Sequence, residues 1–141
     1  MAADDARARY LADRVMTASP AQRVVMLYDR LSLDIARAKA AYAEEDVITA
    51  CTNTSHALRI VSELRGSLDV TMWDGAENLA GIYAFLMNDL IDAGRPAGRH
   101  KLDAIAKVVT DLREGWNAAM EAAASEQTTQ PKARLAGGRV A

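Results

Sequence analysis

The stretch Val15 to Ile35, V-M-T-A-S-P-A-Q-R-V-V-M-L-Y-D-R-L-S-L-D-I, decides the fold of this chain. Ser19 suits the N-cap of a helix, because its hydroxyl can accept a hydrogen bond from a free backbone N–H of the first turn. Pro20 suits the first helical position, where no N–H is needed, and Gln22 is spaced to complete a capping box. Apolar residues then follow in steps of three and four: Val24, Leu27, Tyr28, Leu31, Ile35, Ala38 and Tyr42. This spacing predicts one long amphipathic helix over residues 20–43.

A second helix is predicted over residues 47–65, with Asp46 as its N-cap. Its apolar stripe consists of Val47, Cys51, Thr54, Leu58 and Val61, with Ala50, Ala57 and Leu64 alongside. A cysteine on such a stripe is expected to be a buried, inert thiol. Gly66 follows the helix, where a left-handed C-terminal residue is favoured.

Two more helices follow in the same style. The third is predicted over residues 75–93, with Asp74 as its cap and with Gly94 and Pro96 as its stop signal. The fourth is predicted over residues 98–123 from the regular spacing of its apolar residues. Four long helices joined by short loops predict an all-α protein, an antiparallel four-helix bundle.

The domain organisation follows from where this periodicity begins and ends. Residues 1–18 are predicted to form an N-terminal arm or short helix, either a frayed terminus or a flap that covers an apolar surface. Residues 19–124 form the bundle domain. Residues 125–141 show no periodicity, and their composition is typical of a disordered tail.

Composition limits the classes of function. The chain of 141 residues has a formal net charge of −2 with acids and bases interspersed, so no nucleic-acid partner is expected. The charged residues that flank the first stripe, Asp29 and Asp34, are expected on a solvated face. A single cysteine excludes an intrachain disulfide and suggests a reducing compartment. No apolar run is long enough to enter a membrane as a span, so a soluble, cytoplasmic protein is expected.

No catalytic or metal site is predicted. A dimetal bundle needs Glu-x-x-His pairs, but His56 and His100 have Asn53 and Ala97 at that spacing. No cofactor motif is present, and we expect no enzymatic activity. One alternative is a histidine phosphotransfer module, since Ser55-His56-Ala57-Leu58-Arg59 resembles the phosphorylated segment of such domains. The glycine of that motif is Ile60 here, and a bulky residue would crowd a phosphoryl donor.

The predicted helices carry more apolar residues than a simple bundle needs. The residues outside the main stripes are Met26, Leu33, Ile48, Ile60, Phe85, Met87, Ile91 and Val108. Several exposed apolar residues together favour a groove for an amphipathic partner helix. The alternatives are a wider core or a self-associating structural bundle.

Several segments resemble one known family. They are Tyr10 with V-M-T-A-S-P at 15–20, V-V-M-L-Y-D at 24–29, S-E-L-R-G-S-L-D at 62–69, A-E-N-L-A-G-I-Y-A-F-L-M at 76–87 and D-L-R-E-G-W at 111–116. Over residues 10–120 the chain is similar to the flagellin export chaperones of the FliS family. The pair T-A-S-P and M-L-Y-D at this spacing is the most specific part of the resemblance.

The resemblance implies a cytoplasmic four-helix chaperone without enzymatic activity or cofactor. Such a chaperone binds the C-terminal helical segment of flagellin, prevents premature polymerisation and aids export. The resemblance also implies that an arm containing Tyr10, with Leu11 and Val15 on its apolar side, lies over part of the binding surface in the free protein. Further expected partners are the flagellar export apparatus, other flagellar regulators and, for the free protein, a second copy of the chain.

Overall fold

The structure is a computed structural model that describes residues 3–9, 19–69, 71 and 73–140. Within residues 127–140 only the backbone is described, and the side chains are not. Residues 3–9 form a short helix ahead of the main body. The predicted contacts of Tyr10, Leu11 and Val15 lie outside the described residues.

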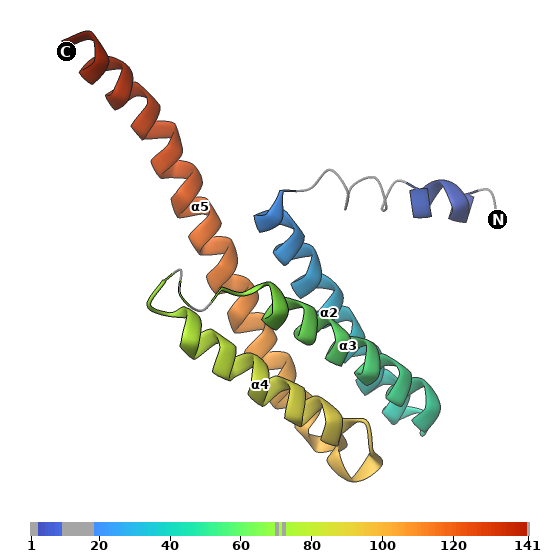
Figure 1. Cartoon of the computed structure of the whole chain (residues 1–141). Helices are drawn as coiled ribbons and strands as arrows, with labels where there is room; N and C mark the ends of the chain where they lie inside the picture. Colours follow the sequence, from blue (N-terminus) through green and yellow to red (C-terminus); the bar gives the residue numbers. More distant parts are fainter. Residues whose placement is uncertain (1–2, 10–18, 70, 72, 141) are drawn as a thin grey trace.

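Four main helices run up and down along one another (Figure 1). They are α2 (Pro20–Ala43), α3 (Val47–Ser67), α4 (Ala76–Ala93) and α5 (Leu102–Val140), with the 3-10 helix η1 (Pro96–Lys101) between α4 and α5. The prediction of an all-α four-helix bundle is therefore confirmed. α5 is helical to Val140, beyond the predicted end at residue 123. The expectation of a disordered tail over residues 125–141 stays a prediction.

The predicted starts of the first two helices are correct in their chemistry. The backbone N–H of Gln22 donates to Ser19 Oγ at 3.1 Å, and Gln22 Oε1 accepts from the Ser19 backbone at 3.1 Å, so the capping box is complete. Asp46 Oδ1 accepts from the backbone N–H of Thr49 at 3.1 Å. These local bonds satisfy N–H groups that have no partner inside the helix.

Two predicted helix ends are wrong. Gly66 is not left-handed, because α3 continues as a helix to Ser67 and its C-cap is Leu68. Asp74 does not cap α4, whose N-cap is Gly75 without a side-chain bond. A backbone turn from Ala76 N–H to Trp73 O, at 3.1 Å, sets that start one residue later than the sequence suggests.

The connection between α4 and α5 also differs from its prediction. The stop signal at Gly94 and Pro96 is confirmed, but residues 96–101 form η1 rather than the start of an α-helix. Gly98 is buried there, and a Cβ at this position would clash with the carbonyl group of Asp92. The tight geometry of a 3-10 turn fits this close approach of backbone to backbone.

The core lies between the four helices. Its largest fully buried side chains are Tyr28, Leu31, Ile35, Val61, Leu86, Leu90, Leu102, Ile105 and Val109. Two polar ties cross it: the hydroxyl groups of Tyr28 and Tyr83 bond each other, and the Tyr42 hydroxyl donates to Ala93 O at 2.6 Å. Burial raises the pKa of all three tyrosines above its ordinary value.

The core-facing side of α3 is rotated relative to the predicted stripe. Val47 is 37% exposed and Cys51 is exposed, so the prediction of a buried thiol is wrong. Ile60, which was expected outside the stripe, is only 5% exposed and belongs to the core. Apolar residues of α3 occur on more than one side of the helix, so the sequence alone does not define its buried side.

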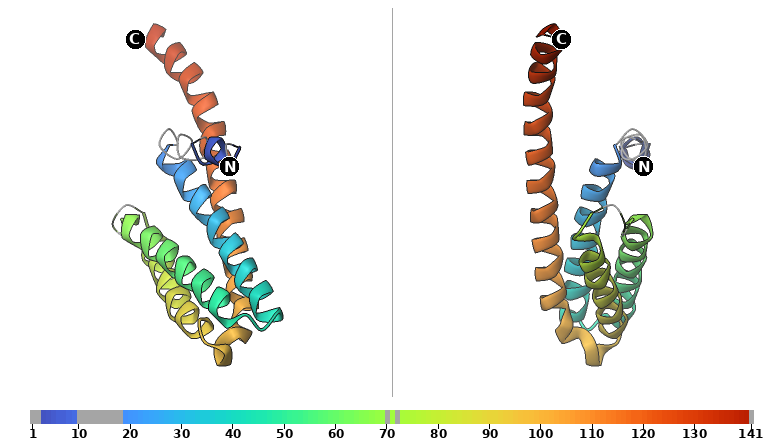
Figure 2. Two further views of the ribbon diagram at one scale, coloured as in Figure 1. Left: turned by 90° about the vertical axis from the view of Figure 1, so that its right-hand side faces the viewer. Right: turned by 60° about the vertical axis from the view of Figure 1, so that its left-hand side comes forward.

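The bundle is closed at one end and open at the other. Figure 2 shows α2 and α5 as one layer and α3 with α4 as the other, diverging away from η1. α5 packs mainly against α2, and it meets α4 over a much smaller contact. Among the described residues, no helix is long and apolar enough to cross a membrane.

Candidate protein-binding surfaces

An apolar cleft lies at the open end of the bundle. It has a volume of about 360 Å³ and is lined by Pro20, Ala21, Arg23, Val24, Leu27, Glu63, Ser67 and Trp116. The indole N–H of Trp116 donates to Ala21 O at 3.2 Å, which fixes the ring against the start of α2. The cleft therefore borders the point where the N-terminal arm joins the bundle at Ser19. The sequence analysis placed Val24 and Leu27 on the buried stripe of the first helix, and their position near the start of that helix is the signal that it missed.

The α4–α5 face carries two of the predicted binding residues. Phe85 is 53% exposed on α4, and Val108 on α5 is half-buried and packs against the core. Leu112, one turn further along α5, is half-buried as well. We refer to these three side chains as the apolar strip: they lie on two helices that make few contacts with each other, and none of the three is fully buried.

The α3–α4 face carries a second apolar group. Ile91 is 49% exposed on α4, and Met87, one turn before it, is half-buried and packs against the core. Ile48 is 82% exposed near the start of α3. The two helices are aligned so that a Cβ at Gly94 would lie 3.3 Å from Thr54 Oγ1. Phe85 points away from this face, since Phe85 and Ile91 are six residues apart and therefore about 120° apart around the axis of α4.

The remaining predicted residues, Met26 and Leu33, lie on the outside of α2. Leu33 is 41% exposed and Met26 is half-buried. They are seven residues apart and therefore share one side of the helix. The predicted site residues are thus spread over three faces, with Ile60 in the core, and the structure does not bring them into one groove.

A buried carboxylate links α2 to α3. Asp34 is fully buried, which contradicts the expectation of a solvated side chain. Its Oδ2 accepts from Nδ1 of His56, whose side chain is 40% exposed. Arg30 Nε lies 3.2 Å from Oδ1, although Oδ1 accepts no hydrogen bond within the described residues. A buried charge needs such partners, so Asp34 and His56 tie α2 to α3.

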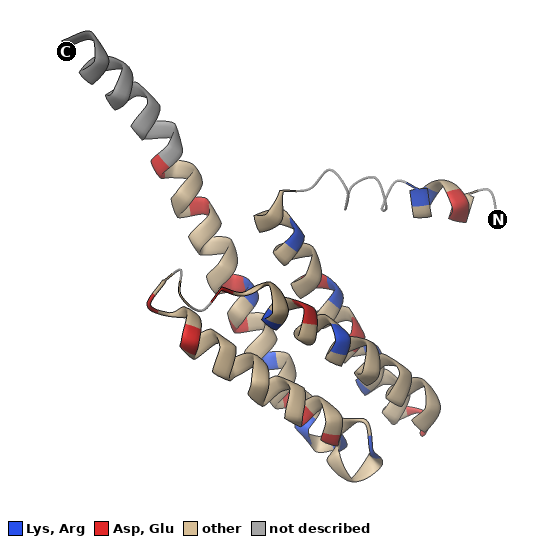
Figure 3. Ribbon diagram, in the orientation of Figure 1, with Lys and Arg blue, Asp and Glu red and all other residues tan. Residues whose placement is uncertain are grey.

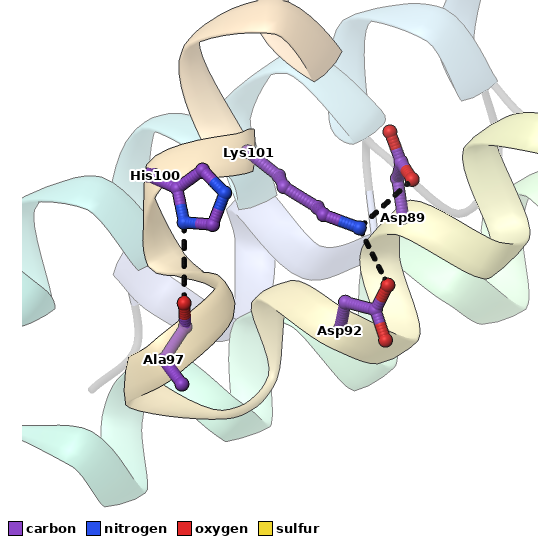
Figure 4. Close-up of polar contacts among 5 residues, drawn as sticks. All are labelled: Asp89, Asp92, Ala97, His100 and Lys101. Carbon is purple, nitrogen blue, oxygen red and sulfur yellow. Dashed lines mark hydrogen bonds and ion pairs between the residues drawn. The ribbon is translucent and has the colours of Figure 1, made fainter.

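The second histidine belongs to the closed end of the bundle. Figure 4 shows His100 Nδ1 at 3.1 Å from Ala97 O, and Lys101 Nζ at 2.6 Å from Asp92 Oδ2 and 3.5 Å from Asp89 Oδ1. The hydrogen bond from Lys101 holds the pKa of Asp92 below its usual value, and the pKa of Lys101 is raised in turn. These contacts hold η1 against α4. In the described part of the chain, no three His, Cys, Asp or Glu side chains are grouped to hold a metal ion.

The geometry defines a class of protein. Its features are a helical bundle, a cleft at the open end and apolar side chains exposed on its sides. Exposed apolar groups of this kind mark surfaces that bind other proteins. The chain therefore has the fold and the exposed apolar surfaces that are typical of protein-binding helical bundles.

Comparisons with known proteins define the class further. The family model of the flagellar protein FliS matches residues 2–123. The flagellar secretion chaperone FliS of Salmonella typhimurium (strain LT2) is 26% identical over 104 residues, which cover 72% of this chain and 77% of that protein. A crystal structure of a bacterial flagellar chaperone has a TM-score of 0.67 and 21% identity, and the match covers 83% of this chain and 96% of the other. The chain belongs to the FliS family of flagellar secretion chaperones.

Family membership confirms the resemblance seen in the sequence and the prediction that the chain is not an enzyme, since the family is non-enzymatic. It also removes the support for a phosphotransfer module. The role of His56 is then the tie to Asp34, and Ile60 does not crowd its exposed side because Ile60 faces the core.

Proposed function

We propose that this chain binds the C-terminal segment of flagellin, keeps the monomer from polymerising in the cytoplasm and presents it for export. The observation that carries the proposal is the partly uncovered apolar strip of Phe85, Val108 and Leu112 between α4 and α5. A partner helix laid along this strip would cover side chains that the protein's own α5 leaves exposed. The name of the Salmonella relative, a flagellar secretion chaperone, supports the same function.

The physical basis is coupled folding and binding. A disordered but amphipathic segment loses conformational entropy when it folds onto a surface. Burial of apolar area, at about 25 cal/mol per Å², offsets that loss. A segment held in this way cannot make the contacts that polymerisation requires.

We propose that the N-terminal arm competes with flagellin for the open-end cleft. It joins the bundle at Ser19, beside Pro20 and Ala21 of the cleft lining, and Tyr10, Leu11 and Val15 give it an apolar side. In the free protein the arm covers the cleft, and flagellin displaces it. Binding to the export apparatus, binding to flagellar regulators and formation of a homodimer by the free protein stay predictions. They concern steps other than the binding of flagellin.

The direct test is calorimetric titration with a peptide from the C-terminal region of the host flagellin. We expect saturable one-to-one binding with a negative heat-capacity change, the mark of apolar burial. Phe85→Ser should weaken binding at least about tenfold, as removal of a central aromatic contact does. Ile48→Ser is the matched control, because Ile48 is even more exposed but lies on α3, outside the strip. Equal affinities for the two variants would refute the α4–α5 site, and absence of any binding would refute the function.

The arm needs its own variant. Tyr10→Ala should change the affinity for the flagellin peptide while the unfolding transition stays where it is. An unchanged affinity with an intact fold would refute the covering arm and leave the α4–α5 site untouched.

A further inference from the structure

Three arginines form a regular row on α2. Arg23, Arg30 and Arg37 are seven residues apart, which places them on one side of the helix at intervals of about 10.5 Å. Met26 and Leu33 repeat with the same period and lie three or four residues from the arginines, so each apolar side chain has an arginine before and after it. Figure 3 shows basic bands recurring along α2.

The contact between Asp34 and His56 shows where this row lies. Asp34 reaches across to His56 on α3, and Arg30 is one turn before Asp34 on the same side of α2. Arg59 follows His56 by three residues and therefore lies on the same side of α3. Because α2 and α3 are antiparallel, Arg59 and Arg30 lie at the same height on the two helices.

The charges on this α2–α3 face are unbalanced. Arg23, Arg37 and Arg59 are exposed and form no ion pair with any described side chain, while Arg30 is paired only with the buried Asp34. Glu63 is the acidic side chain that faces the same side, at the cleft. Several bases on other faces are paired, as Lys39 is with Asp103 at 2.6 Å and Arg113 with Asp29 at 2.5 Å. A chain of net charge −2 thus concentrates unpaired positive charge on one face.

We propose that the α2–α3 face binds an acidic amphipathic helix of another protein. Arginines two turns apart match carboxylates that repeat along a helix, and Met26 with Leu33 supplies the apolar seam between them. DNA would present a charge about every 1.7 Å of its axis, far denser than the arginine row, and it would leave the apolar seam without a partner. Guanidinium groups bind carboxylates in a paired geometry, which favours an acidic protein.

This face is separate from the α4–α5 strip proposed for flagellin, and it shares Arg23 and Glu63 with the open-end cleft. Phe85 and Val108 lie on α4 and α5, whereas the arginines lie on α2 and α3, in the opposite part of the bundle. The two sites are therefore independent, and a carrier bound to flagellin can bind the second helix at the same time. Failure of one proposal leaves the other standing, because they use different side chains.

The probe is a synthetic three-heptad helical peptide with Leu at the seam positions and Glu on both flanks, whose like charges keep it from pairing with itself. Fluorescence anisotropy with the full chain should show saturable binding that weakens as salt is added. Arg59→Glu should lower the affinity at least fivefold, and Leu33→Ser should lower it as well. Arg65→Glu is the matched control, since it makes the same charge change at another exposed position of α3. If Arg59→Glu unfolds the chain, Arg37→Glu replaces it in the same comparison.

Three results would overturn the proposal. The first is equal binding of a peptide with Lys in place of Glu, or of a scrambled acidic peptide, because the helix and its charges would then be irrelevant. The second is binding of a single-stranded oligonucleotide or of anionic vesicles, lost in Arg59→Glu, when the acidic peptide does not bind. The third is an equal loss of flagellin-peptide affinity in Arg59→Glu, because the face would then belong to the flagellin site.

Discussion

Asp34 shows how a single residue can hold two helices in one arrangement. Its carboxylate is fully buried between α2 and α3, and His56 and Arg30 are its partners. A buried pair of this kind adds little net stability compared with apolar residues, but the loss of one partner is costly. The pair therefore favours this register of α2 against α3 over others.

His56→Ala should lower the free energy of unfolding by about 2 kcal/mol, because it leaves a buried acceptor without its donor. The measurement is urea denaturation followed by circular dichroism. His100→Ala is the control and should cost less than about 0.5 kcal/mol, since His100 is exposed and bonds only a backbone carbonyl. Equal losses in the two variants would contradict the role assigned to Asp34.

The buried tyrosines make the free energy of unfolding depend on pH in the alkaline range. Burial raises the pKa of Tyr83 and Tyr28 in the folded chain. In the unfolded chain both tyrosines have the ordinary pKa of about 10. Above that pH the unfolded state loses protons that the folded state keeps, so the stability present below pH 10 is lost as the pH rises. The free energy of unfolding should fall by up to about 1.4 kcal/mol per pH unit for each tyrosine.

Denaturation of the wild type and of Tyr83→Phe between pH 8 and 11 tests this dependence. Tyr83→Phe should show a shallower decline, because one titrating group is gone. Parallel curves would mean that other groups, such as Lys101, cause the decline.

At the scale of elements, two glycines look alike in the sequence but have opposite roles in the structure. Gly66 lies inside α3 with no atom within 4 Å of where a Cβ would stand, whereas Gly98 in η1 touches the backbone of Asp92. Both lie near a helix boundary. Only the packing of η1 onto α4 separates them.

Gly66→Ala should therefore raise the unfolding free energy by about 1 kcal/mol, because alanine is the better helix former. Gly98→Ala should lower it by about 1–3 kcal/mol, as overpacking does. Thermal and urea unfolding of the two variants give the comparison. A loss in Gly66→Ala would show that this residue is left-handed after all.

The helices themselves were largely predictable, and their faces were only partly so. The range 20–43 and its capping box follow from Ser19, Pro20 and Gln22, because these signals act within one turn. The predicted buried side of α3 was wrong at Cys51, which is exposed, and at Ile60, which is buried. The reason is that α3 carries apolar residues on more than one of its sides. Which side is buried depends on where α2 and α4 lie, and periodicity alone does not contain that information.

At the scale of the whole molecule, the open end of the bundle contributes more to the proposed binding of a partner than the closely packed core does. All the described core residues lie between Tyr28 and Val109, so α5 beyond Trp116 adds little to the packing. The shape of the bundle gives the chain an apolar cleft at the start of α2 and an apolar strip between α4 and α5. Both features suit a protein that binds an extended segment.

Removal of residues 127–141 should leave the unfolding midpoint within about 2 °C of the wild type, since no described core residue lies in that segment. Calorimetry of the shortened chain measures it. Affinity for the flagellin peptide should also be unchanged. A large drop in the midpoint would show that the segment packs on the bundle.

The sequence by itself determined the helical class, the start of α2, the cap at Asp46 and, through its motifs, the family. These depend on contacts within a few residues or on a recognisable order of residues. Only the tertiary structure decided that Asp34 is buried against His56, that Ile60 belongs to the core and that the candidate binding residues fall on three faces. The physical reason is that each of these depends on which helix lies beside which, and at what height, and such contacts join residues that are far apart in the chain.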